Sequence, residues 1–249
     1  MNLLLIFIFG LVIGSFLNVC ISRIPRSESI VFPPSRCEIC NNRIKAYDLV
    51  PVASFLLLRG KCRYCGCKLS WRYPGIEILT GILFILVYRV IDVNLHLIPY
   101  LFLTSLLLVI SFIDIDHYRI PNRLIIVGFV AGIAFNFLIP DLFLWESCMG
   151  FITGGGILFL IALLSQGGMG GGDIKLGALI GLFLGWKLML LSLFLAALLA
   201  SIAGIGLMLT HKKSRKDPIP FGPFLALGAF ISLLWGHHLL LWYTNYFFK

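Results

Sequence analysis

The sequence predicts an all-α polytopic membrane protein of about eight transmembrane helices, with a small cysteine-containing insertion after the first helix. Of the 249 residues, 59% are hydrophobic and only 12% are charged, which is more apolar surface than a soluble domain of this size can bury. The apolar residues form long runs near the ~20 residues that a helix needs to cross a bilayer. One long polar segment, residues 22–75, interrupts these runs and contains two CxxC pairs.

The eight expected spans run over residues 2–21, 76–93, 95–113, 122–139, 148–164, 174–189, 190–209 and 221–242. The first span has no basic residue ahead of it and has Arg23 and Arg26 just after it. A cleaved secretory signal carries its positive charge at the start, so this span is expected to be a retained helix with its N-terminus outside. The fifth and sixth spans depart most from the pattern, because one contains Gly154-Gly155-Gly156 and the other leads almost directly into the seventh.

The distribution of basic residues predicts the orientation. Alternating eight spans from an outside N-terminus places segments 22–75, 114–121, 165–173 and 210–220 inside. Seventeen of the twenty Lys and Arg residues then lie inside, when Arg123 and Lys175 are counted with the cytoplasmic helix ends that they adjoin. Cytoplasmic loops carry such an excess. The net charge of +9 therefore indicates a cytoplasmic face beside anionic lipid headgroups, and no nucleic-acid partner. The bilayer itself is the expected partner of this surface.

The two CxxC pairs predict a structural zinc site in the cytoplasmic segment. Cys37 and Cys40 are separated from Cys62 and Cys65 by a spacing close to that of zinc knuckles, and four thiolates from two tight turns can bind Zn²⁺ tetrahedrally. Two disulfides are the alternative, which the reducing cytosol disfavours. Cys67 can replace Cys65 as the last ligand. The metal is expected to fold a segment that is too small for a core of its own.

Asp173 is the most informative single residue. It directly follows a glycine run over residues 167–172 and directly precedes an apolar helix. An acid at a membrane boundary is a functional candidate, because charges are costly beside hydrocarbon. The alternative is a purely structural role, in which Asp173 is the N-cap of the helix. Capping alone does not call for so many glycines, which allow close approach of an extended peptide.

Asp114 is the second candidate acid, at the end of the apolar span 95–113 and on the same predicted face as Asp173. Two facing carboxylates can share one proton and activate water, as an aspartic protease requires. The alternative is that Asp114 has no catalytic role and only faces lipid headgroups at the end of its helix. Asp116, two residues later, would point to a different face if the helix continued.

Other function classes fit less well. No HExxH, GxSxG or Walker motif occurs. A transporter or channel would place acids near mid-bilayer in broken helices, often with internal repeats, whereas these acids lie at one face. A membrane scaffold with a zinc site and no catalysis is the third interpretation, in which both aspartates are caps.

Several blocks, in order along nearly the whole chain, together resemble the type IV prepilin peptidases, which are membrane aspartic proteases of the GxGD kind. Gly170-Gly171-Gly172-Asp173 matches the GxGD signature. The family's other catalytic aspartate lies six residues before an Ile-Pro pair, which here selects Asp114 over Asp116. The other matching blocks are Gly14-Ser15-Phe16-Leu17-Asn18-Val19 with Arg23-Ile24-Pro25-Arg26, the CxxC pairs, Arg59-Gly60-Lys61-Cys62, Arg72-Tyr73-Pro74 with Glu77, and Ile219-Pro220-Phe221-Gly222-Pro223.

The resemblance implies a bifunctional enzyme of the bacterial inner (cytoplasmic) membrane. It would cut the leader from type IV prepilins or pseudopilins at the cytoplasmic face, with Asp114 and Asp173 as the catalytic pair. It would then methylate the new N-terminal amine with S-adenosylmethionine. The family links methylation to the zinc segment, so the expected parts are the first helix (1–21), a zinc-binding methyltransferase segment (22–75) and a peptidase domain (76–249). Leu49, after Asp48, departs from the Asn that the family usually has.

Overall fold

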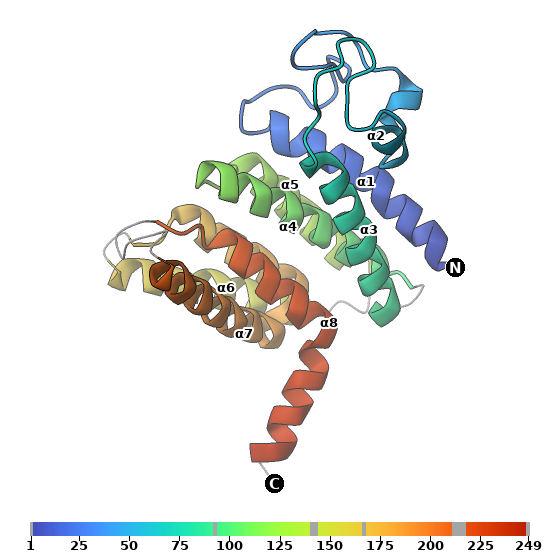
Figure 1. Ribbon diagram of the computed structural model, residues 1–249. Coiled ribbons are helices and arrows are strands. Elements are labelled where there is room, and N and C mark those ends of the chain that lie inside the picture. Colours follow the sequence, from blue (N-terminus) through green and yellow to red (C-terminus); the bar gives the residue numbers. More distant parts are fainter. Residues whose placement is uncertain (1, 92–93, 140–143, 166–167, 211–217, 248–249) are drawn as a thin grey trace. The chain divides into compact units, whose positions relative to one another are not determined.

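The computed structural model describes residues 2–91, 94–139, 144–165, 168–210 and 218–247 (Figure 1). Over these residues the regular secondary structure is helical, with isolated β-bridges only between Arg36 and Arg43 and between Lys61 and Lys68. Contacts divide the chain into two compact units, residues 1–93 and 94–249. The sequence analysis divided the chain into three parts by the activity expected of each part. That division stays a prediction.

Unit 1 consists of two long helices and the loop-rich segment between them. Helix α1 (Leu3–Arg23) packs against α3 (Arg72–Ile91), and the segment between them holds only a 3₁₀ turn (Ala46–Leu49) and the short α2 (Ala53–Leu57). The two long helices approach closely, because a Cβ atom at Gly10 would lie 2.6 Å from the Cα atom of Gly81. Small residues permit such contact between membrane helices. The last two residues of the predicted span 76–93 lie outside the described residues.

Unit 2 is a bundle of five helices. They are α4 (Leu97–His117), α5 (Asn122–Leu138), α6 (Leu144–Leu164), α7 (Gly171–Leu209) and α8 (Gly222–Phe247). Across the described residues, six helices are long and apolar enough to cross a membrane, and α5 is a shorter apolar helix. With α7 divided in two, as described next, these helices correspond to the eight expected spans. The all-helical membrane fold is confirmed.

Helix α7 is a helical hairpin that turns at Gly185, where the backbone adopts φ 76° and ψ 170°. A Cβ atom at Gly154 of α6 would meet both the backbone of Gly177 and the Cε atom of Met189. In an unbroken helix these two α7 residues would be roughly 18 Å apart, so the chain folds back between them. The predicted boundary at 189/190 is therefore wrong. The turn lies at Gly185 because glycine adopts a positive φ without steric cost.

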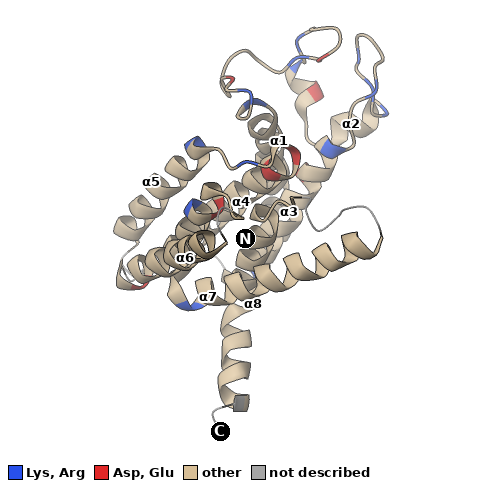
Figure 2. Ribbon diagram, turned by 90° about the vertical axis from the view of Figure 1, so that its left-hand side faces the viewer, with Lys and Arg blue, Asp and Glu red and all other residues tan. Residues whose placement is uncertain are grey.

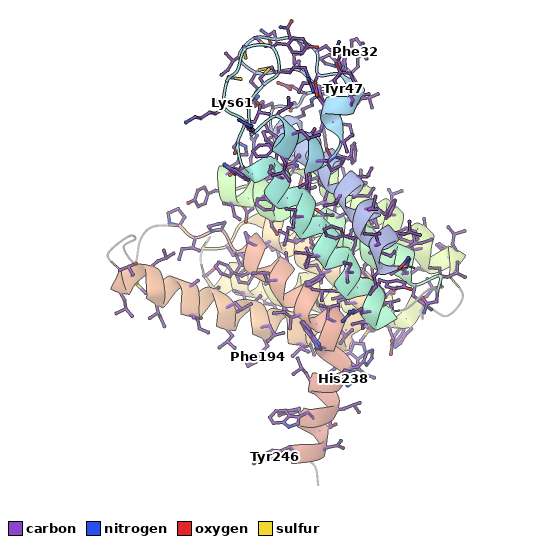
Figure 3. The ribbon with its side chains drawn as sticks, turned by 45° about the vertical axis from the view of Figure 1, so that its right-hand side comes forward. Phe32, Tyr47, Lys61, Phe194, His238 and Tyr246 are labelled. Carbon is purple, nitrogen blue, oxygen red and sulfur yellow. The ribbon has the colours of Figure 1, made fainter. Side chains whose placement is uncertain are left out.

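The outer surface of the helices remains apolar. Exposed side chains recur along the second half of α7 at Phe194, Leu198, Ile202 and Ile205, and Phe194 projects outward from its helix (Figure 3). Exposure of such a stripe of large apolar side chains to water is unfavourable, whereas its contact with lipid tails is not. The charged residues of unit 1 gather instead in the loops between α1 and α3 (Figure 2).

Backbone contact between α6 and α7 gives a first prediction. A Cβ atom at Gly150 would overlap the carbonyl oxygen of Gly181, whereas one at Gly156, on the same helix, would meet nothing within 4 Å. We expect Gly150→Ala to lower the thermal unfolding midpoint in detergent, because overpacking costs about 1–3 kcal/mol. Gly156→Ala is the matched control and should unfold like the intact protein. Equal midpoints for the two variants would contradict the close packing.

Candidate active site and metal centre

The predicted span 95–113 implied that Asp114 lies in a loop after the helix. In the structure Asp114 lies inside helix α4. The helix continues to His117 and ends at Tyr118, which has the left-handed conformation with φ 52°. The continuing helix buries Asp114, which is 5% exposed, and leaves Asp116 exposed. This is the separation of faces expected for acids two positions apart. Asp114 and Asp116 therefore have different environments.

Asp173 lies in the first turn of α7, where it is partly buried. The N-cap position belongs to Gly170, so the interpretation of Asp173 as an N-cap is wrong. The run of glycines keeps the helix start narrow, and a Cβ atom at Gly170 would lie 3.3 Å from Oδ2 of Asp173. Gly167, at the start of that run, lies outside the described residues.

The two acids lie at the same end of the unit 2 bundle, Asp114 in the last turn of α4 and Asp173 in the first turn of α7. Their carboxyl groups are close enough to interact electrostatically. The starts of α5 and α7 lie at this same end of the bundle, since Nζ of Lys175 in α7 donates a hydrogen bond to Oδ1 of Asn122 in α5 at 2.8 Å. The structure thus brings together the two acids that the sequence selected, from helices α4 and α7.

The start of α8 completes this site. The backbone N–H of Gly222 donates to Oδ2 of Asp114 at 3.1 Å, and this hydrogen bond is buried. The first N–H groups of a helix have no partner within the helix, so Asp114 satisfies one of them and lies at the positive end of the helix dipole. Gly222 belongs to a block that the resemblance matched, but no role was assigned to it from the sequence. Its position between Pro220 and Pro223 is the local signal that marked a constrained helix start.

Ile120 fills the space between the three helix ends. A Cβ atom at Gly172 would lie 2.9 Å from Cβ of Ile120, and one at Gly222 would lie 3.4 Å from its Cδ1. The same Cβ atom at Gly222 would lie 2.7 Å from Oδ2 of Asp114. The site therefore depends on glycine at both helix starts, because any side chain there would displace Ile120 or Asp114.

The cysteine pairs converge in the segment between α1 and α3. The Sγ atoms of Cys37, Cys40, Cys62 and Cys65 all lie within 4.8 Å of one another, and none forms a disulfide. The Sγ atoms of Cys37 and Cys65 are 3.9 Å apart, and those of Cys40 and Cys62 are 4.0 Å apart. Four sulfurs bound tetrahedrally at 2.3 Å would be ~3.8 Å apart. The cluster can hold a metal ion, and these four cysteines are free thiols in the structure.

The two cysteine turns repeat the same backbone pattern, which we call the first and second knuckles (residues 36–43 and 61–68). The N–H of Cys37 donates to the carbonyl of Asn42, and the N–H of Cys62 donates to that of Cys67. The fourth residue after each first cysteine has a positive φ, 54° at Asn41 and 69° at Gly66. The repeat makes Cys65 equivalent to Cys40, and Cys67 equivalent to Asn42.

Backbone hydrogen bonds favour a thiolate at the first cysteine of each knuckle, Cys37 and Cys62, whereas burial and hydrogen bonds with neighbouring thiols raise the pKa of Cys40 and Cys65 to about 11. Hydrogen bonds from the backbone N–H groups of Cys40 and Ile39 lower the pKa of Cys37 to about 6. Metal ligands bind as thiolates, so a lowered pKa suits this role. The carboxylate of Asp48 accepts three hydrogen bonds from Arg63 of the second knuckle, at 2.6–3.1 Å, and Arg63 holds the pKa of Asp48 below its usual range. Asp48 is thus a structural partner of the knuckle.

Glu77 joins the segment to the helices of unit 1. This buried side chain of α3 accepts a hydrogen bond at 2.8 Å from the N–H of Val52, which has a positive φ of 59° and precedes α2. Asn18 of α1 donates to the carbonyl of Tyr73 at 3.0 Å. The resemblance matched Asn18, Tyr73 and Glu77 as blocks. The contacts show that they hold the helix ends and the segment together.

Comparisons with known proteins identify the family of the chain. Residues 8–91 match the family described as Bacterial Peptidase A24 N-terminal domain, and residues 101–205 match the Type IV leader peptidase family. The chain is similar to a prepilin leader peptidase/N-methyltransferase of Bacillus subtilis (strain 168), at 36% identity over 97% of both chains. A protein of the same name from Aeromonas hydrophila is 35% identical, over 98% of this chain and 94% of its own.

No solved structure was found to match the chain. The similarity to the curated proteins extends to Pseudomonas aeruginosa, where a prepilin leader peptidase/N-methyltransferase is 30% identical over 96% of this chain and 92% of its own. Both family matches follow one another along the chain in the order of units 1 and 2. The protein belongs to the type IV leader peptidase family.

Proposed function

We propose that this protein is a bifunctional prepilin peptidase. It cleaves the leader peptide of type IV prepilins or pseudopilins and N-methylates the new N-terminal residue with S-adenosylmethionine. The observation that supports it most is the meeting of Asp114 and Asp173 at one end of unit 2, with Asp114 held by the N–H of Gly222. The names of relatives similar over nearly the whole chain support the same reaction.

The aspartate pair carries out the hydrolysis. One carboxylate takes a proton from water while the other, protonated, donates a hydrogen bond to the scissile carbonyl. Two carboxyl groups at one site can share one proton, and they then titrate as a pair. The proton passes to the leaving amine as the tetrahedral intermediate collapses. The Gly222 N–H fixes the orientation of Asp114 throughout, which keeps the reacting oxygens in place.

Methylation belongs to unit 1 in this proposal. S-adenosylmethionine, when bound, supplies a methyl group that is transferred to the freed N-terminal amine, which loses one proton. The thiolates of Cys37, Cys40, Cys62 and Cys65 hold a structural Zn²⁺, for which the distances between the sulfurs are suitable. The repeat of the two knuckles favours Cys65 over Cys67 as the fourth ligand. Zinc binding stabilises a segment with few buried side chains.

The sidedness of the sites is part of the proposal. Ten of the twenty basic residues lie between Arg23 and Arg72, so the positive-inside rule puts the metal segment in the cytoplasm of a bacterial inner membrane. Alternation of the helices then brings Asp114 and Asp173 to the cytoplasmic face. A substrate with an apolar helix can enter from the bilayer, with its cleavage site at the membrane edge.

A direct test uses the purified enzyme in lipid nanodiscs with a purified prepilin. We expect release of the leader without S-adenosylmethionine. With this methyl donor, the mature N-terminus should gain the mass of one methyl group. Mass spectrometry of the products measures both steps. Leader release without methyl gain in the presence of the donor would remove the transferase from the proposal, and an intact precursor for several prepilins would contradict the peptidase.

The Gly222 contact gives a prediction for the peptidase. In Gly222→Ala the new Cβ atom would displace Asp114, so kcat/KM for leader release should fall roughly 100-fold, as for a reacting group misplaced by about 1 Å. Gly171→Ala is the matched control, because a Cβ atom there meets nothing within 4 Å. Cleavage rates by both variants, at equal folded concentration, are the measurement. Equal rates for the two would contradict the positioning role.

A further inference from the structure

The second knuckle contains a fifth thiol that a four-coordinate metal does not use. The Sγ atom of Cys67 lies 3.5 Å from that of Cys37, closer than the 3.9 Å between Cys37 and Cys65. In the first knuckle the equivalent position is Asn42, whose carbonyl accepts the same backbone hydrogen bond. The knuckle therefore forms without a thiol at this position, and Cys67 contacts the cluster as an additional nucleophile.

Exposure distinguishes the two contacting thiols. Cys37 is 4% exposed, whereas Cys67 is partly exposed. An oxidant from solvent therefore reaches Cys67 more readily than the buried cysteine. Zinc ligation also protects Cys37, because its sulfur electrons are shared with the metal, while Cys67 outside the ligand set is unprotected. Accessible thiols beside a second cysteine are the usual sites of reversible oxidation.

We propose that Cys67 is an oxidation site through which a hydroperoxide releases the metal from the knuckles. This inference rests on the zinc site proposed above and adds a reaction at a residue outside it. The ligand chemistry is that of a small hydroperoxide, which needs no preformed pocket because Cys67 is partly exposed.

The reaction has two balanced steps. Cys67 loses its proton, and the thiolate attacks the terminal oxygen of the hydroperoxide. The O–O bond breaks, and the alkoxide that leaves takes up the proton, which gives a sulfenic acid at Cys67 and an alcohol. The Cys37 thiolate then attacks the Cys67 sulfur and displaces hydroxide, which forms the disulfide. The two sulfurs together lose the two electrons that reduce the O–O bond. The Sγ atoms have to approach from 3.5 Å to ~2.05 Å.

When the Cys37 sulfur forms the disulfide, only three thiolates remain to bind the metal. The segment then loses the metal–sulfur bond through which Cys37 links the two knuckles. The peptidase site in unit 2 has no cysteine, so oxidation should stop methylation and leave leader cleavage intact. A thiol reductant reverses the disulfide, and added zinc then restores the segment.

The test uses the full-length, zinc-loaded enzyme in nanodiscs, treated with tert-butyl hydroperoxide. Metal release is followed with a zinc-binding dye, and disulfides are mapped by mass spectrometry of unreduced peptides. Cys67→Asn makes the second knuckle resemble the first, and Cys67→Ser is the second variant. We expect the intact enzyme to release zinc several-fold faster than both variants and to contain a Cys37–Cys67 disulfide.

Equal release rates in the intact enzyme and both variants would overturn the inference, as would disulfides confined to Cys37–Cys40 and Cys62–Cys65. The zinc content before oxidation separates this inference from the function on which it rests. An untreated enzyme that is active in methylation but holds no zinc would overturn the metal assignment and the oxidation site together. Leader cleavage by that enzyme would leave the peptidase proposal standing.

Discussion

Replacing either Asp114 or Asp173 with Asn should abolish leader cleavage. Each variant keeps the size of the side chain but removes the ability to exchange a proton, and general acid–base catalysis contributes about 10²–10⁴-fold for each such group. Asn at position 114 can still contact the N–H of Gly222, so the fold should persist. Rates of leader release from a purified prepilin, with thermal unfolding as the check of folding, are the measurement.

Asp116→Asn is the matched control for these variants. Asp116 lies on the same helix, two residues from Asp114, but is exposed, so its variant should cleave at the rate of the intact enzyme. Full activity of Asp114→Asn or Asp173→Asn would eliminate the dyad. It would favour the interpretation of the two acids as structural residues of a scaffold.

Removing a metal ligand should separate the two activities. In Cys40→Ser or Cys62→Ser the cluster loses one of its four thiolates, so zinc content should fall and the segment between α1 and α3 should lose its fold, because zinc binding supplies folding energy. We expect methylation to be lost and leader cleavage to be retained. Metal analysis and the mass of the processed N-terminus measure the two effects.

Cys148→Ser is the control for the zinc prediction, because Cys148 is an exposed cysteine of α6 outside the cluster. It should keep both its zinc and its methyltransferase activity. Methylation that survives in Cys62→Ser at an unchanged rate would contradict the role assigned to the segment. A loss of zinc in Cys148→Ser would show that the effects of cysteine removal are not specific to the knuckles.

Local patterns in the sequence predicted most of this architecture. Hydrophobic runs of membrane length are dictated by the bilayer, so the eight spans, which are six separate helices and the two halves of the α7 hairpin, could be anticipated from these runs. The cysteine spacing predicted the metal cluster, because two CxxC turns bring four sulfurs together whatever surrounds them. The expected separation of Asp114 from Asp116 followed from helix geometry and is confirmed by burial.

Features that depend on distant contacts could not be predicted. The run from Ile174 to Leu209 contains only Lys175 and Lys187 as charged residues, and no local signal selects Gly185 among its glycines as the turn. The hydrogen bond from Gly222 to Asp114 joins residues 108 positions apart. The choice between Cys65 and Cys67 is similar, because it depends on the backbone repeat of the two knuckles and not on spacing.

The most direct test of the central claim is the mass of a prepilin N-terminus after co-expression with the intact enzyme and, in parallel, with Asp173→Asn. The account predicts loss of the leader and gain of one methyl group with the intact enzyme, and an unchanged precursor with the variant. A processed N-terminus in the presence of folded Asp173→Asn protein would contradict the assignment of cleavage to the aspartate pair.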